Sequence, residues 1–172
     1  MSAPCKNGIV LIGFMGAGKS TVAAELGRSC RLPVFDLDRE IERMSGRTIP
    51  EIFEQSGEEA FRSQETEALR GLLDQAPLIL ATGGGVIGRA DNWPLLRRLG
   101  RVVYLRVSWE TALTRIGSGQ GRPLAGDRER LQALFEQRRP LYEQADLVID
   151  GEGGTPATIA RDILRKLYWE KA

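Results

Sequence analysis

Residues 13–20 constrain the fold of this chain more than any other stretch, because they fit the pattern G-x-x-x-x-G-K-[ST] at every fixed position. The glycines of this pattern turn the backbone tightly and present its N–H groups to an anion. Lys19 supplies a point charge for the outer phosphates, and the Ser20 hydroxyl is a hard oxygen ligand for Mg²⁺. The stretch therefore predicts a loop that holds the phosphates of a nucleoside triphosphate.

The residues around this loop favour the same interpretation over an ordinary glycine-rich turn. Residues 8–12 form a continuous apolar run typical of a buried strand, and residues 21–28 follow as a helix. A helix that begins at Lys19 adds its positive end to the attraction for anions. The expected nucleotide contacts are Gly16, Ala17, Gly18, Lys19, Ser20 and Thr21.

Short apolar strands alternate with helices five times along the chain, which predicts a parallel sheet covered on both faces, with ligands at the carboxyl ends of the strands. The expected strands are residues 8–12, 32–36, 77–81, 101–105 and 147–149. The expected later helices are residues 38–44 (with Asp38 as a possible N-cap), 48–55, 58–73, 91–99, 108–116, 128–140 and 155–168. The glycine-rich residues 117–127 have little to pack, so we expect them to form a mobile lid.

The overall composition sets the class of protein. The chain has 172 residues, 42% of them apolar and 27% charged, which is typical of one globular domain spanning residues 1–172. A net charge of +1 argues against a nucleic-acid partner or a membrane-surface role. No apolar run approaches the length of a membrane span, and no secretion signal is evident, so we expect a cytoplasmic protein.

Two scarce residue types narrow the chemistry. The chain has no histidine, which excludes a histidine base or metal ligand. Its only cysteines are Cys5 and Cys30, and in a reducing compartment we do not expect them to form a disulfide. Any metal must therefore be held by oxygen, and any general base must be a carboxylate or a lysine.

Two acidic residues end the second strand, on the side of the sheet where the phosphate-binding loop lies. Asp36 is placed to help hold the water shell of Mg²⁺, and Asp38 to hydrogen-bond an acceptor hydroxyl and take its proton. An alternative is that Asp38 only caps the helix that follows.

Helical periodicity separates the candidate arginines. Arg138 lies on the apolar stripe that includes Leu131, whereas Arg139 is rotated off it. Arg62 shares a stripe with Glu65, so a purely structural ion pair is one interpretation of it. The other is that Arg62 and Arg138 together bind an acceptor that carries a carboxylate as well as hydroxyls.

Two glycine-rich segments add candidates. Residues 83–85 are three successive glycines, which let a ligand approach the backbone, although a tight turn would also need one or two of them. Arg122 lies in the expected lid, either to contact the transferred phosphate or simply to remain in solvent.

Taken in order, these residues resemble the shikimate kinase family over nearly all of the chain. The stretches that carry the resemblance are residues 13–20, 35–38, 61–65, 83–85, 122–124 and 138–142. The resemblance implies transfer of the ATP γ-phosphate to the 3-hydroxyl of shikimate, on the route to chorismate and the aromatic amino acids. It also implies the fold of nucleoside monophosphate kinases, with strand order 2-3-1-4-5, an acceptor-binding region at residues 37–62 and a mobile lid.

At the acceptor end, the resemblance assigns roles residue by residue. Asp38 matches the acid that binds the acceptor hydroxyls and activates one of them. Arg62 and Arg138 match the pair that holds the shikimate carboxylate, in agreement with the periodicity. Gly84 and Gly85 match backbone contacts to shikimate.

The same resemblance implies the remaining acceptor and metal contacts. Phe53 and Phe61 look like the apolar wall of the acceptor pocket. Asp36 and Ser20 match the residues beside Mg²⁺, with Asp36 acting through water. The implied small-molecule partners are ATP, ADP and shikimate, with Mg²⁺ as the cofactor, and we expect a monomer.

At the nucleotide end the chain departs from part of the family. Arg122 matches the lid arginine on the phosphates, and Arg115 the arginine against the adenine. Some members have a further arginine just before the proline that opens the last helix, where this chain has Thr155. Adenine contacts are therefore expected from Arg115 and from backbone.

Two other functions fit parts of the sequence. A gluconate kinase or a nucleoside monophosphate kinase would use the same loop with a different acceptor. A regulatory nucleotide-binding module would use the loop without needing Arg62 or Arg138, but the chain has no N-K-x-D stretch to read guanine.

Overall fold

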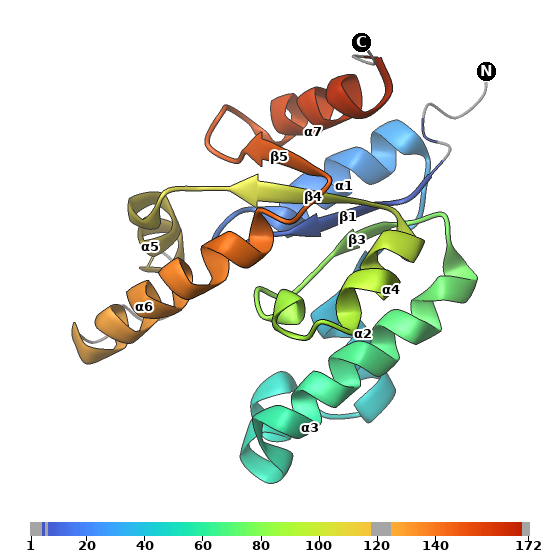
Figure 1. Ribbon diagram of the computed structural model, residues 1–172. Coiled ribbons are helices and arrows are strands. Elements are labelled where there is room, and N and C mark those ends of the chain that lie inside the picture. Colours follow the sequence, from blue (N-terminus) through green and yellow to red (C-terminus); the bar gives the residue numbers. More distant parts are fainter. Residues whose placement is uncertain (1–4, 6, 118–124, 170–172) are drawn as a thin grey trace.

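The computed structural model describes residue 5 and residues 7–117 and 125–169, which contain a five-stranded, all-parallel sheet (Figure 1). The strands are β1 (Ile9–Ile12), β2 (Val34–Asp36), β3 (Ile79–Ala81), β4 (Arg101–Arg106) and β5 (Leu147–Asp150). Their order across the sheet is β2-β3-β1-β4-β5. The predicted parallel sheet and its strand order are confirmed.

Helices cover both faces of this sheet. They are α1 (Lys19–Cys30), α2 (Leu37–Ser45), α3 (Ile49–Leu72), α4 (Asn92–Leu99), α5 (Trp109–Gly117), α6 (Ala125–Tyr142) and α7 (Pro156–Leu164), with short turns at Leu73–Gln75, Val86–Gly88 and Arg165–Trp169. Helices α1 and α7 pack together on one face, and α4 lies on the other with α3 against it (Figure 1). None of the helices in the described part of the chain is long and apolar enough to cross a membrane.

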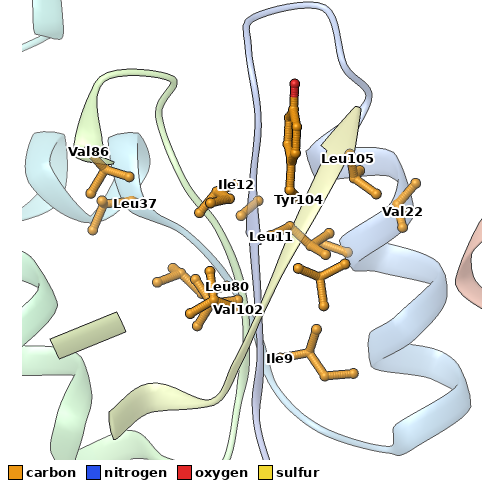
Figure 2. Close-up of a cluster of buried hydrophobic side chains, with 14 of the residues drawn as sticks. Ile9, Leu11, Ile12, Val22, Leu37, Leu80, Val86, Val102, Tyr104 and Leu105 are labelled. Carbon is orange, nitrogen blue, oxygen red and sulfur yellow. The ribbon is translucent and has the colours of Figure 1, made fainter. Parts of the chain in front are cut away.

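The core lies on both sides of β1, all four residues of which are buried. Ile9 and Leu11 lie on the side of the sheet that faces α1, while Leu37 and Val86 lie next to each other on the opposite side (Figure 2). Continuous apolar strands are expected when a parallel sheet is buried on both faces. This packing fixes the carboxyl ends of β1, β2 and β3 side by side.

Two predicted helices are joined into one. The segments expected at residues 48–55 and 58–73 form the single helix α3, kinked at Gly57, where φ is 80° and ψ is 175°. Only glycine adopts this region of backbone space readily, so the predicted break between the two helices is present as this kink.

Helix α6 is longer than predicted at both ends. It begins at Ala125, inside the segment expected to be a lid, and continues through Pro140 to Tyr142. Residues 118–124 of the expected lid, including Arg122, lie outside the described residues.

The expectation that the two cysteines stay unpaired is wrong. Cys5, ahead of β1, forms a disulfide with Cys30 at the end of α1, and their Cα atoms are 5.3 Å apart. Both residues are buried, at 4% and 0% exposure. Reasoning from the usual redox compartment could not show that folding brings these two thiols together in the core.

Candidate active site

The phosphate-binding loop lies between β1 and α1, as predicted. Gly13, Gly16 and Gly18 have φ values of 150°, 79° and 90°, which explains why glycine is needed there. The Lys19 ammonium folds back over the loop and donates to the carbonyl oxygens of Gly13 (2.7 Å) and Phe14 (2.9 Å). Burial lowers the pKa of Lys19 to about 8, against the opposing effect of the Asp38 and Asp36 carboxylates.

Asp36 connects the phosphate-binding loop to the acceptor side. The Ser20 hydroxyl donates to Asp36 Oδ2 at 3.1 Å. The other oxygen, Oδ1, accepts from the backbone N–H groups of Asp38 (3.1 Å) and Arg39 (3.4 Å) and so caps α2. Asp36 is therefore the helix cap, and the alternative in which Asp38 merely caps α2 is wrong.

The Asp38 carboxylate takes no part in capping α2. Its Oδ1 atom is buried and has no hydrogen-bond partner among the described residues. Burial raises the pKa of Asp38, and Asp36 adds to the rise, while the Lys19 charge opposes it. A half-buried carboxylate with an unsatisfied oxygen and a raised pKa is typical of a group that accepts a proton from a ligand.

Arg62 pairs with Glu65, but one carboxylate oxygen of Glu65 remains without a hydrogen bond among the described residues. Its Nη1 donates to Glu65 Oε2 at 2.7 Å and its Nη2 to the exposed Glu58 at 3.2 Å. Glu65 is fully buried, yet its Oε1 atom has no partner among the described residues. The Arg62 guanidinium also lies 5.1 Å from the centre of the Phe61 ring. The ion pair therefore holds the Arg62 side chain in place while one oxygen of Glu65 can still accept a hydrogen bond.

The two aromatic residues expected at the acceptor wall lie together. The ring centres of Phe53 and Phe61 are 4.7 Å apart. Phe61 is buried, whereas Phe53 is 39% exposed and leaves apolar surface beside Arg62 open to solvent.

The two neighbouring arginines of α6 separate as periodicity predicted. Arg138 is half-buried, whereas Arg139 is exposed and pairs with Glu136 at 3.7 Å. One turn beyond Arg138, the Tyr142 hydroxyl donates to the carbonyl oxygen of Gly84 at 2.5 Å. Burial raises the pKa of Tyr142, although the adjacent Arg138 opposes this, so the phenol remains a donor.

The three glycines at residues 83–85 form the floor on which these side chains meet. A methyl group on the first would lie 3.0 Å from Asp38 Oδ1, and one on the second 3.4 Å from Arg138 Nη1. A methyl group on the third would lie 2.3 Å from Arg62 Nη1. Side chains of Asp38, Arg138 and Arg62 therefore leave little room for a larger residue at any of the three positions. A simple turn would need glycine at only one or two of them.

The cluster of Asp38, Arg62 and Arg138 lies next to the phosphate-binding loop. A methyl group on Gly84 would also lie 3.6 Å from the carbonyl oxygen of Gly13, one of the two that Lys19 binds. Since β1 and β3 are hydrogen-bonded neighbours, the residues after each strand meet at the same edge of the sheet. The carboxylate, the two arginines and the phosphate-binding loop thus face one space.

A separate cavity of about 340 Å³ lies on the other side of the loop. It is lined by residues of the phosphate-binding loop, α1, α5, the connection from β5 to α7, and α7 itself: Gly16, Ala17, Gly18, Thr21, Val22, Arg115, Gly151, Gly154, Pro156 and Ile159. Arg115 donates to the carbonyl oxygens of Gly16 (3.1 Å), Ala17 (3.3 Å) and Gly151 (3.4 Å). The walls are mainly backbone and small side chains.

Sequence reasoning gave no role to Tyr142 or to Asn92. Asn92 is fully buried; it accepts from the Thr66 hydroxyl (2.8 Å) and donates to the carbonyl oxygen of Val86 (2.8 Å). It therefore connects α3 to the segment after the three glycines. The inward stripe of α6 could have identified Tyr142, but nothing local in the sequence marks Asn92.

Fold and site together define a class of protein. A parallel sheet in this order, a phosphate-binding loop after β1, and a cluster of charged side chains beside it are the features of a small-molecule kinase with a P-loop fold.

Comparison with known proteins identifies the family. The family model for shikimate kinase matches residues 15–168. A shikimate kinase of Thioalkalivibrio sulfidiphilus is 43% identical over 166 residues, covering 94% of this chain and 83% of the relative. The chain belongs to the shikimate kinase family.

Solved structures agree. Shikimate kinase from Acinetobacter baumannii in complex with shikimate superposes with a TM-score of 0.88 at 39% identity, over 96% of this chain and 94% of that one. Shikimate kinase from Aquifex aeolicus superposes with a TM-score of 0.83 at 36% identity, over 92% of this chain and 95% of that one. The protein is an ATP-dependent kinase that acts on shikimate, and the gluconate, nucleoside monophosphate and regulatory alternatives are set aside.

Proposed function

We propose that this chain phosphorylates the 3-hydroxyl of shikimate with the side chains gathered around residues 83–85. The observation that carries the proposal is the meeting of Asp38, Arg62 and Arg138 on that glycine floor, next to the phosphate-binding loop. In this arrangement Arg62 and Arg138 bind the acceptor carboxylate, because paired guanidinium groups suit a planar anion. The backbone of Gly84 and Gly85 contacts the acceptor ring.

Asp38 then acts on the acceptor hydroxyl. Its unpartnered Oδ1 accepts the hydroxyl hydrogen bond and takes the proton as the oxygen attacks the γ-phosphorus. Burial raises the pKa of Asp38, which makes it a better proton acceptor than an ordinary carboxylate. Phe53 and Phe61 form the apolar wall that orients the ring and keeps water from the attacking oxygen.

At the nucleotide end, we assign the phosphates to the backbone of residues 16–18, with Lys19 and Thr21, and the base to the cavity beside Arg115. Lys19 neutralises charge that develops on the phosphate oxygens during transfer. Arg122, from the segment beyond the described residues, adds a second positive charge there. A monomer is sufficient, because one chain supplies both ends of the site, and the use of ATP favours a cytoplasmic location.

Mg²⁺ fits the residues beside the loop. Ser20 and Asp36 place two hard oxygens 3.1 Å apart, and Mg²⁺ prefers such ligands together with nucleotide phosphates and water. No group of three acidic or cysteine side chains in the described residues could hold a metal without the nucleotide. When bound, the ion neutralises phosphate charge, and Ser20 and Asp36 (through water) hold it.

Turnover with defined acceptors tests the proposal. Purified protein with ATP, Mg²⁺ and shikimate is expected to release ADP and form shikimate 3-phosphate, whereas gluconate and AMP give no turnover. Arg62→Ala and Arg138→Ala are expected to lose shikimate binding and keep ADP binding. ADP release that does not depend on shikimate, or persists with gluconate, would contradict the proposal.

A further inference from the structure

Glu152 lies in the connection from β5 to α7 and reaches across to the start of α5. One of its oxygens, Oε1, accepts from both the backbone N–H and the hydroxyl of Ser108, each at 2.7 Å. The hydroxyls of Ser108 and Thr111 lower the pKa of Glu152 to about 2. Glu152 is therefore a carboxylate at any physiological pH.

This contact completes a helix cap with a residue from another element. The Ser108 hydroxyl accepts from the backbone N–H of Thr111 at 3.2 Å, as an N-cap serine does. In the usual capping box, the third residue of the same helix returns a carboxylate to the N-cap backbone N–H. That position holds Thr111 here, and Glu152, 44 residues after Ser108, supplies the carboxylate instead.

The other end of α5 is connected to the same loop. Arg115 donates to the carbonyl oxygen of Gly151, next to Glu152, and to those of Gly16 and Ala17 in the phosphate-binding loop. These three segments line part of the cavity of about 340 Å³, together with residues of α1 and α7. How closely α5 lies against residues 151–154 therefore contributes to the width of the cavity.

We propose that Glu152 is a positioning residue for the nucleotide base. By holding the loop of residues 151–154 to α5 from outside the cavity, it fixes the separation between Arg115 and the loop backbone. The inference rests on the proposed placement of the base beside Arg115.

Direct titration with ADP in the presence of Mg²⁺ tests this role without depending on turnover. Glu152→Ala is expected to weaken ADP binding about three- to tenfold, since an exposed charged hydrogen bond contributes modestly. KM for ATP rises by the same factor, while kcat and KM for shikimate stay within twofold. Glu152→Gln, which keeps an oxygen for Ser108, is expected to recover most of the affinity.

Glu110→Ala is the matched control. It removes the same charge from the same end of α5, but the Glu110 carboxylate has no hydrogen bond to another element among the described residues. We expect its ADP affinity within twofold of wild type. Equal weakening in Glu110→Ala and Glu152→Ala would overturn the inference, because charge at the helix end would then be sufficient.

Two further outcomes separate this inference from the proposed function. A lower melting temperature for Glu152→Ala with unchanged ADP affinity would make Glu152 only a helix cap and overturn the positioning role. Arg115→Ala with unchanged ADP affinity would overturn the base site, and the role of Glu152 with it. Failure of the wild type to phosphorylate shikimate would overturn the acceptor assignment, while the ADP titrations would still decide the role of Glu152.

Discussion

The proposed acceptor end and the proposed nucleotide end of this site differ in the chemical groups that form their surfaces. At the acceptor end, charged side chains from α2, α3 and α6 converge on residues 83–85. At the nucleotide end, most of the surface is backbone and small side chains from residues 13–18 and 151–154. Buried charged groups reject a ligand that leaves them unpaired, whereas backbone accepts any phosphate. Selectivity for the acceptor should therefore be the more sensitive of the two to single substitutions.

The largest effect is expected from Asp38→Asn. The amide keeps the size of the carboxylate but cannot take a proton, so kcat should fall by about 10²- to 10⁴-fold. ADP affinity should stay unchanged, because no part of the nucleotide end is altered. Rapid-quench measurement of a single turnover checks this. A loss of less than tenfold would show that Asp38 only orients the hydroxyl.

Arg138→Ala is expected to come next. It removes a half-buried charge that we assign to the acceptor carboxylate, and kcat/KM for shikimate should fall about ten- to hundredfold. Arg139→Ala, its exposed neighbour, is the control and should remain within twofold. Steady-state kinetics with shikimate varied at saturating ATP distinguishes the two. Similar losses in both variants would contradict the inward and outward assignment.

Gly85→Ala tests the glycine floor. The added methyl group would lie 2.3 Å from Arg62 Nη1 and so displace a guanidinium that Glu65 holds in place. KM for shikimate should rise about five- to fiftyfold, with ADP affinity unchanged. Gly88→Ala is the matched control, because a methyl group there meets nothing within 4 Å. An unchanged KM in Gly85→Ala would mean that Arg62 moves aside without cost.

The nucleotide end should respond to alkaline pH. Because burial lowers the pKa of Lys19 to about 8, the free enzyme loses this positive charge as the pH rises through 8, well below the usual 10.5. We expect kcat/KM for ATP to fall about tenfold for each pH unit above that value. Lys19 is not among the side chains that we assign to shikimate, so shikimate affinity should stay level. A profile for ATP that is flat to pH 10 would contradict the lowered pKa.

The smallest effect on catalysis is expected from the disulfide. Reduction with dithiothreitol should lower the free energy of unfolding by about 2–4 kcal/mol, because the bridge closes a loop with a sequence separation of 25. It should leave kcat unchanged, since neither end of the site contains Cys5 or Cys30. Urea unfolding with and without reductant measures this. The double variant Cys5→Ala/Cys30→Ala should be insensitive to reductant, and two free thiols in the denatured oxidised protein would contradict the bridge.

Periodicity and a short motif in the sequence predicted the features of this molecule that depend on residues close together in the chain. The parallel sheet and the phosphate-binding loop follow from strand and helix periodicity with a motif of fixed spacing, whereas only the resemblance to the shikimate kinase family implied the strand order. The inward direction of Arg138 also follows from periodicity, since one residue of a helix faces in while the next is rotated by about 100°.

Features that depend on distant contacts could not be predicted in the same way. Asp36 rather than Asp38 caps α2 because the strand passes into the helix without a connecting residue, and the sequence shows only two nearby acids. The Cys5–Cys30 bridge and the contact of Glu152 with Ser108 depend on distances that exist only after folding. No local signal marks either one.

The kink at Gly57 lies between the residues that we assign to the acceptor. Phe53 comes from the part of α3 before the kink, and Phe61 and Arg62 come from the part after it. A methyl group on Gly57 would meet nothing within 4 Å, so the need for glycine there is one of backbone torsion rather than space. The direction of residues 49–56, which carry Phe53, can therefore change independently of Arg62, which we assign to the acceptor carboxylate. A redesign that re-angles residues 49–56 can admit a bulkier acid without rebuilding the groups that bind its charge.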